Sequence, residues 1–141
     1  MMKLSGKIGL AAAVLGMTVA FGPAALADAP SVTATPSTGL VDGQSVSAAV
    51  AGFAAGEEVI VAQCANPGGV VVCDWASTVH FNADGSGSGS ASVTVHATYE
   101  GKTQTGEVYG TVDCATIDGG CKVGAVNATY TTVAYTPISF G

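Results

Sequence analysis

The chain has 141 residues, of which 48% are hydrophobic, 10% charged and 6% aromatic, so its length suits one domain at most. Four basic residues against ten acidic ones give a formal net charge of -6, which argues against a protein that binds nucleic acid phosphates through its own cations. Leu, Glu, Lys and Arg, which helical bundles need, are scarce, whereas Val, Thr, Ser, Ala and Gly are abundant. The composition predicts an all-β domain.

The first 27 residues have the pattern of a secretory signal peptide. Lys3 and Lys7 precede a mostly apolar stretch at residues 8–21, and small residues follow, ending in Ala25-Leu26-Ala27. The apolar stretch is shorter than the roughly 20 residues that a stable membrane anchor needs. We therefore expect cleavage after Ala27 and export of residues 28–141 as a soluble, monomeric domain outside the cell, with no membrane attachment.

All four cysteines, Cys64, Cys73, Cys114 and Cys121, lie in the expected exported part. An even number of cysteines in a small exported chain indicates two disulfides, for which three pairings are possible. Pairing of Cys64 with Cys73 and of Cys114 with Cys121 is favoured, because each segment contains turn residues. These are NPGG at 66–69 in the first segment and Gly119-Gly120 in the second. A zinc site is the alternative, but the spacings are not CxxC and exported thiols usually oxidise, so we expect no metal.

Short runs of alternating apolar and polar residues recur along the rest of the chain and predict seven to nine strands with one buried face. Turn residues separate most of these runs at intervals of about ten residues, which favours a β-sandwich or barrel. The Gly/Ser-rich segment 85–90 is expected to be a hairpin loop rather than a linker, and Gly101 is expected in a turn. In chain order, the expected strands cover residues 31–35, 46–50, 59–63, 79–82, 91–97, 108–112, 122–126, 129–134 and 137–140.

The chain has no set of residues typical of a catalytic site. His80 and His96 are the only histidines, and both lie in strand patterns where solvent-facing side chains are expected. There is no GxSxG motif that would frame a catalytic serine and no glycine loop that would cradle phosphate. Glu57, Glu58 and Asp113 are better explained as solvated strand ends than as a glycosidase pair. We therefore expect a binding module and no enzyme.

Trp75 is the aromatic residue that core packing explains least. It follows Cys73 by two positions in a stretch rich in turn residues. Two interpretations remain open: the indole lines a ligand cleft, or it only covers the disulfide.

Short motifs lie in order along the expected exported part: Ala29-Pro30, VTATPSTGL at 32–40, DGQSV at 42–46, AQCA at 62–65, YEG at 99–101, GTVDC at 110–114, Cys121 with Val123-Gly124, and ISFG at 138–141. Taken together, these motifs make residues 28–141 resemble the neocarzinostatin family along their whole length. The resemblance implies a seven-stranded antiparallel immunoglobulin-like β-sandwich, with a cleft beside two disulfide-closed hairpins. It also implies an actinomycete antibiotic apoprotein that binds and shields an enediyne chromophore non-covalently, with DNA damaged only by the released chromophore. An apolar cleft that excludes water suits such a short-lived ligand.

The resemblance also implies which segments line the cleft. These segments are residues 66–72, 75–78, 102–106 and 123–126. At the positions that match the family's aromatic residues, this chain has Asn66-Pro67, Ala76-Ser77-Thr78 and Thr103-Gln104-Thr105. Three possibilities follow: Trp75 compensates, the cleft takes a chromophore of another shape, or the chain is an orphan secreted interaction module without an enediyne. A hydrolase of basic proteins has the weakest support. The candidate ligand-binding residues are Gln63 and Gly124 on the cleft floor, together with Asn66, Pro67, Trp75, Thr78, Gln104 and Val126.

Overall fold

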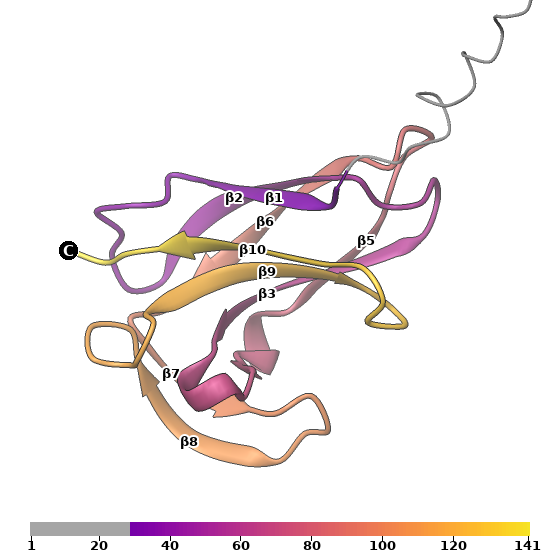
Figure 1. The fold of residues 1–141 in the computed structure, drawn as a ribbon. Coiled ribbons are helices and arrows are strands. Elements are labelled where there is room, and N and C mark those ends of the chain that lie inside the picture. The colour runs from indigo at the N-terminus through magenta and orange to yellow at the C-terminus, as the bar shows by residue number, and fades with distance from the viewer. Residues whose placement is uncertain (1–28) are drawn as a thin grey trace, which may run out of the picture.

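The computed structural model describes residues 29–141, so the expected signal peptide lies outside the described residues. Two antiparallel β-sheets pack face to face as a sandwich (Figure 1). No helix in this part of the chain is long and apolar enough to cross a membrane. The all-β sandwich that the composition and the resemblance predict is confirmed.

The smaller sheet has three strands, in the order β1-β2-β6. The larger sheet has seven, in the order β10-β9-β3-β4-β7-β8, with β5 paired to β3. The total of ten includes the two-residue β4 and the four-residue β5. The elements are β1 (Ser31–Thr35), β2 (Gln44–Ala51), β3 (Glu58–Ala65), η1 (Pro67–Gly69), β4 (Val72–Cys73), η2 (Trp75–Ser77), β5 (Val79–Asn82), β6 (Gly89–Val95), β7 (Thr98–Lys102), β8 (Val108–Asp113), β9 (Cys121–Asn127) and β10 (Val133–Ile138).

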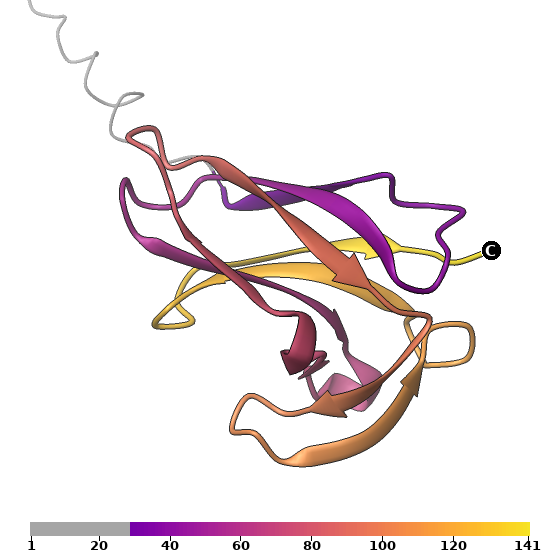
Figure 2. The same ribbon diagram turned by 180° about the vertical axis from the view of Figure 1, so that it is seen from behind.

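Strand β3 organises the larger sheet because it has different partners along its length. Its first half pairs with β5 and its last two residues pair with β4, while β9 runs along its other side. After β3 the chain forms η1, returns to pair with β3 as β4, forms η2 and then pairs with β3 again as β5. Beyond β4, the β7–β8 hairpin bends away from the sandwich, as both views show (Figures 1 and 2).

The hydrophobic core lies between the two sheets and follows the two-residue period of the strands. Val59 and Val61 of β3 and Val123 and Ala125 of β9 are fully buried. Burying a valine side chain contributes about 1.5 to 3 kcal/mol. The smaller sheet supplies the facing residues, which are Val32, Val46, Ala48, Val50, Val93 and Val95.

Both disulfides form locally, which confirms the predicted pairing. Cys64 of β3 and Cys73 of β4 are opposite each other in the strand register, with sulfurs 2.06 Å apart. Cys114 and Cys121 close the loop between β8 and β9. No cysteine in the described part of the chain is free.

Two glycines that were expected outside strands lie within them. In both cases a neighbouring side chain is so close that only a residue without a side chain fits. Gly101 is part of β7 rather than a turn, and a Cβ there would lie 2.8 Å from Cγ2 of Val112. Gly89 begins β6 rather than ending a loop, and a Cβ there would lie 2.6 Å from the ring of Phe81.

The prediction of two separate strands at 129–134 and 137–140 was wrong. A turn precedes one strand, β10, which includes Pro137. The turn forms because Oδ1 of Asn127 accepts hydrogen bonds from the backbone N–H groups of Thr131 (2.8 Å) and Thr132 (3.0 Å). Pro137 is tolerated because β10 is an edge strand.

Candidate functional site

A cavity of about 400 Å³ lies on the outer face of the larger sheet, opposite the core. Its floor uses the residues that alternate with the core residues: Ile60, Ala62 and Cys64 of β3, and Gly124 and Val126 of β9. The complete lining is Ile60, Ala62, Cys64, Val71, Cys73, Trp75, Thr78, His80, Gln104, Gly124, Val126, Tyr130, Val133 and Tyr135.

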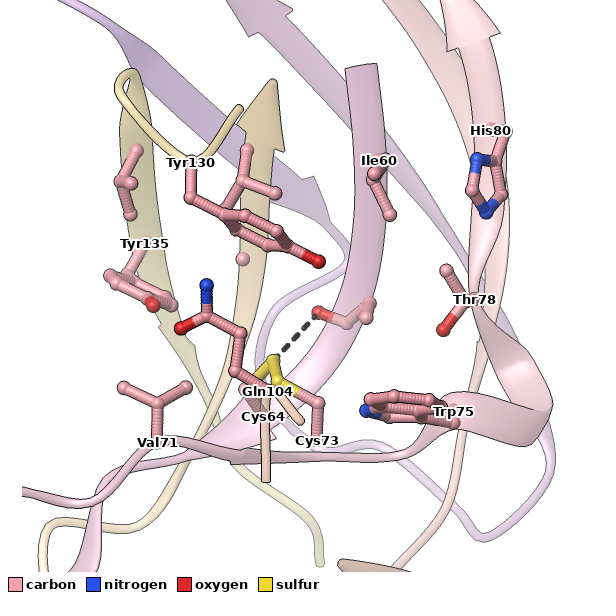
Figure 3. Close-up of a pocket in the computed structure, with 14 residues that line it drawn as sticks. Ile60, Cys64, Val71, Cys73, Trp75, Thr78, His80, Gln104, Tyr130 and Tyr135 are labelled. Carbon is pink, nitrogen blue, oxygen red and sulfur yellow. Dashed lines mark hydrogen bonds between the residues drawn. A yellow bond between two sulfur atoms is a disulfide. The ribbon is translucent and has the colours of Figure 1, made fainter. Parts of the chain in front are cut away.

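The walls come from segments on either side of this floor (Figure 3). Trp75, Thr78 and His80 form one wall, and Tyr130 and Tyr135 form the other. The Cys64–Cys73 disulfide lies between the two walls, so it is part of the cavity surface. The cavity is mostly apolar, and no Lys or Arg is among its lining residues. These properties suit an apolar ligand that a few polar groups orient.

Trp75 is held in place by the short turn η2. The buried Asp74 caps this turn, since its Oδ1 accepts a hydrogen bond of 3.2 Å from the N–H of Ala76. The N–H of Asp74 in turn donates to the carbonyl oxygen of Gln63 at 2.8 Å. A Cβ at Gly106 would lie 3.4 Å from the indole, so the β7–β8 loop packs against Trp75. The indole is still 46% exposed and lines the cavity beside the disulfide.

Tyr135 lies across the backbone of β9 because its register partner is Gly124. A Cβ at Gly124 would be 2.7 Å from Cε1 of Tyr135, so only glycine leaves room for the ring. Burial raises the pKa of the Tyr135 hydroxyl above its ordinary value of 10. Tyr130 extends from the β9–β10 turn at a φ of 58°, in the turn that the Asn127 side chain holds.

Five of the eight predicted ligand-binding residues come together at this cavity. They are Trp75, Thr78, Gln104, Gly124 and Val126. Asn66 and Pro67 lie in the η1 hairpin and are not among the lining residues.

Gln63 lies on the opposite face of β3 and is fully buried. Its amide bonds to the backbone of His96, with Nε2 donating to the carbonyl oxygen (2.8 Å) and Oε1 accepting from the N–H (2.7 Å). The structure therefore gives Gln63 a role in joining β3 to the chain after β6, away from the cavity.

Sequence reasoning missed several lining residues, above all Tyr130, Tyr135 and His80. The resemblance directed attention to other segments, and the predicted strands at 129–134 and 137–140 put Tyr130 in a strand and Tyr135 between two strands. The usable signal was alternation around the buried Ala134, which puts Val133 and Tyr135 on one face. His80 is solvent-exposed as expected, but it also stands at the edge of the cavity.

The two histidines each pair with one carboxylate. Nδ1 of His80 lies 2.8 Å from Oε2 of Glu58, and Nδ1 of His96 lies 3.2 Å from Oδ2 of Asp74. Within residues 29–141, no three His, Cys, Asp or Glu side chains are grouped closely enough to hold a metal ion.

Comparison with known proteins identifies relatives along most of the chain. Residues 32–140 match the neocarzinostatin family. The chain is 46% identical over 121 residues to the antitumor antibiotic C-1027 apoprotein of Streptomyces globisporus, covering 86% of this chain and 78% of that protein. Actinoxanthin, from the same organism, has the same identity and coverage.

A solved structure has the same fold. The macromomycin structure matches with a TM-score of 0.74 at 33% identity, over 80% of this chain and all of that one. These matches confirm the resemblance that the sequence motifs indicate. The family consists of chromophore carriers rather than enzymes. The chain belongs to the neocarzinostatin family, the apoproteins of enediyne chromoprotein antibiotics.

Proposed function

We propose that this chain is exported after cleavage at Ala27 and holds an enediyne-type chromophore, non-covalently, in the cavity on the outer face of the larger sheet. The observation that carries the proposal is the cavity itself. Its volume of about 400 Å³ lies in the range of small-molecule sites, and its lining is mostly apolar. Family membership adds the class of ligand.

Aromatic side chains support a chromophore ligand, although Tyr130 and Tyr135 come from a segment that the resemblance does not indicate. The segments where the family has aromatic residues contribute Val71, Thr78 and Gln104 to this cavity. Trp75, Tyr130 and Tyr135 supply aromatic surface in their place, on two facing walls. This arrangement favours compensation by Trp75 and a chromophore of a different shape over an orphan module with no ligand.

The protein would act as a carrier and shield. A ligand that fills an apolar cleft keeps water and nucleophiles away from the part of it that the cleft covers, which prolongs its life. The net charge of -6 gives the protein no attraction of its own to DNA, so DNA damage belongs to the released chromophore. Since one cavity is built from one chain, we expect the carrier to work as a monomer.

Mass spectrometry of protein purified in the dark from the producer's culture medium tests this function. We expect the native spectrum to contain one extra small-molecule mass per chain and the denaturing spectrum to lack it. The released molecule should absorb in the near ultraviolet. A chain that carries only its two disulfides, under conditions that preserve the complexes of relatives, would contradict the proposal and favour an interaction module.

A further inference from the structure

Thr78 and His80 put polar atoms on one wall of the cavity, and the Glu58 carboxylate contacts His80. We call these three residues the β5 wall. His80 lies on β5 and Thr78 immediately precedes it, so both point to the same side at a spacing of two residues. Figure 3 shows them in line with Trp75 along one side of the cavity.

The contact between His80 and Glu58 fixes which imidazole nitrogen carries the proton. Nδ1 of His80 lies 2.8 Å from Oε2 of Glu58. An ionised carboxylate only accepts hydrogen bonds, so in the neutral ring Nδ1 bears the hydrogen and Nε2 bears a lone pair. In Figure 3 the ring nitrogen at the lower edge of His80 faces along the wall toward Thr78. His80 therefore presents a hydrogen-bond acceptor there.

Thr78 presents an acceptor as well. Its hydroxyl hydrogen is directed to the carbonyl oxygen of Asp74 at 3.3 Å. The lone pairs of the hydroxyl oxygen are left for a partner in the cavity. Two acceptors therefore lie two residues apart on one wall, and the Glu58 carboxylate is paired with the first of them, His80.

We infer that the β5 wall recognises a hydrogen-bond donor on the bound ligand, either a hydroxyl or a protonated amine, and that His80 determines this specificity. The inference rests on the proposed function, since it assigns a subsite within the same cavity. A ligand carboxylate would lose water there against two acceptors and a negative charge, with no Lys or Arg in the lining to compensate. The wall therefore selects for donors and against anions.

Four naphthalene probes that differ only in a short side chain at position 2 test the inference. They are 2-ethylnaphthalene, 2-(2-naphthyl)ethanol, 2-(2-naphthyl)ethylamine and the anion of 2-naphthaleneacetic acid, called the acetate below. Their dissociation constants for the exported chain would be measured at pH 8 by following backbone amide signals of the cavity lining by NMR. We expect the alcohol and the amine to bind at least about tenfold more tightly than the acetate. Tighter binding of the amine than of the alcohol would assign part of the effect to the charge of Glu58.

Two variants separate the wall from the rest of the cavity. His80→Phe keeps a planar ring but removes both nitrogens, and we expect it to abolish most of the preference for donors over the acetate. Glu58→Gln removes the charge and the fixed tautomer, and we expect a smaller loss. Within each variant, the affinity of every polar probe is divided by that of 2-ethylnaphthalene, which has no polar group, so that a change in cavity shape or apolar contact cancels from the comparison.

The possible failures can be told apart. If 2-ethylnaphthalene binds in the cavity but His80→Phe leaves the order of the other probes unchanged, the inference is overturned and the proposed function stands. Tighter binding of the acetate than of the alcohol would overturn it in the same way. If none of the four probes perturbs the lining residues, the β5 wall recognises no donor and the inference fails, whereas the proposed function is decided separately by the mass spectra of the protein from the culture medium.

Discussion

Neighbouring residues of β3 belong to two different parts of the molecule. Val61 and Gln63 face the smaller sheet and are fully buried, whereas Ala62 and Cys64, one position away, line the cavity. The two-residue period of the strand therefore separates the residues that hold the sheets together from those that can meet a ligand. Substitutions on the outer face can change ligand choice without dismantling the core.

The two disulfides follow the same division. Cys64–Cys73 is part of the cavity surface and lies next to the η2 turn that carries Trp75. Cys114–Cys121 belongs to the inner side, where Sγ of Cys114 accepts a hydrogen bond from Nε2 of Gln63 at 3.2 Å. Substitutions on the two faces should therefore separate stability from binding.

Removing either disulfide should produce the largest loss of stability. The loops have sequence separations of 9 and 7 residues, and we expect replacement of each cysteine pair by alanines to lower the free energy of unfolding by about 2.5 to 3 kcal/mol. Only the Cys64→Ala, Cys73→Ala variant should also lose ligand affinity. Urea unfolding measures the loss of stability, and titration with the ligand, at a temperature where both variants are folded, measures the loss of affinity. Equal losses of ligand affinity in the two variants would contradict the separation of the core-facing side from the cavity-facing side.

Gln63→Ala should cause the second-largest loss of stability and should leave ligand affinity unchanged. The substitution leaves the N–H and the carbonyl oxygen of His96 without their buried partner, which costs about 2 to 3 kcal/mol. Gln104→Ala is the matched control on the cavity side, where an exposed amide should cost less than about 0.5 kcal/mol of stability. A loss of ligand affinity in folded Gln63→Ala would show that the inner face contributes to the site.

Trp75→Ala should show the opposite pattern. Because the indole is half exposed, the free energy of unfolding should change little, while ligand affinity falls by about 1 to 3 kcal/mol. Trp75→Phe is the control, since it keeps an aromatic face and should recover part of the affinity. Isothermal titration of the isolated ligand measures both variants, and unchanged affinity would remove Trp75 from the site.

The smallest effect concerns pH. Burial raises the pKa of Tyr135 in the folded chain above 10, so the fold prefers the neutral phenol. The stability linked to this group is fully present below pH 10 and is lost as the pH rises through the folded pKa. Tyr135→Phe should therefore lose less stability than the unmodified chain between pH 9 and pH 11, as measured by urea unfolding. If the free energy of unfolding falls equally with pH in the two proteins, the raised pKa of Tyr135 is contradicted.

Much of the fold could be predicted from the sequence because alternation and local turns are short-range signals. Local disulfide pairing followed from glycines inside each loop. The turn before β10 was missed because it depends on the Asn127 side chain binding the backbone four and five residues later. Gly101 was misassigned because its need for glycine comes from Val72 and Val112, which are far away in sequence.

The candidate site was only partly predictable. Gln63 alternates with Ala62 and shares the parity of Val59 and Val61, so its inward orientation was available from the strand pattern itself. Alternation around Ala134 indicates that Tyr135 faces outward, but its position over Gly124 depends on the register between β9 and β10, which the pattern of one strand does not give. Long-range register, rather than residue type, therefore decides which aromatic side chains line the cavity.

The most direct test of the binding face compares amide NMR spectra of the ligand-loaded protein, isolated in the dark, with spectra of the same sample after the ligand is extracted. The outer face should change most, at residues such as Thr78, Gly124 and Tyr135, while Val61 and Gln63 stay nearly constant. Changes concentrated at Val61 and Gln63, or on β8 away from the cavity, would contradict the assignment of binding to the outer face of the larger sheet.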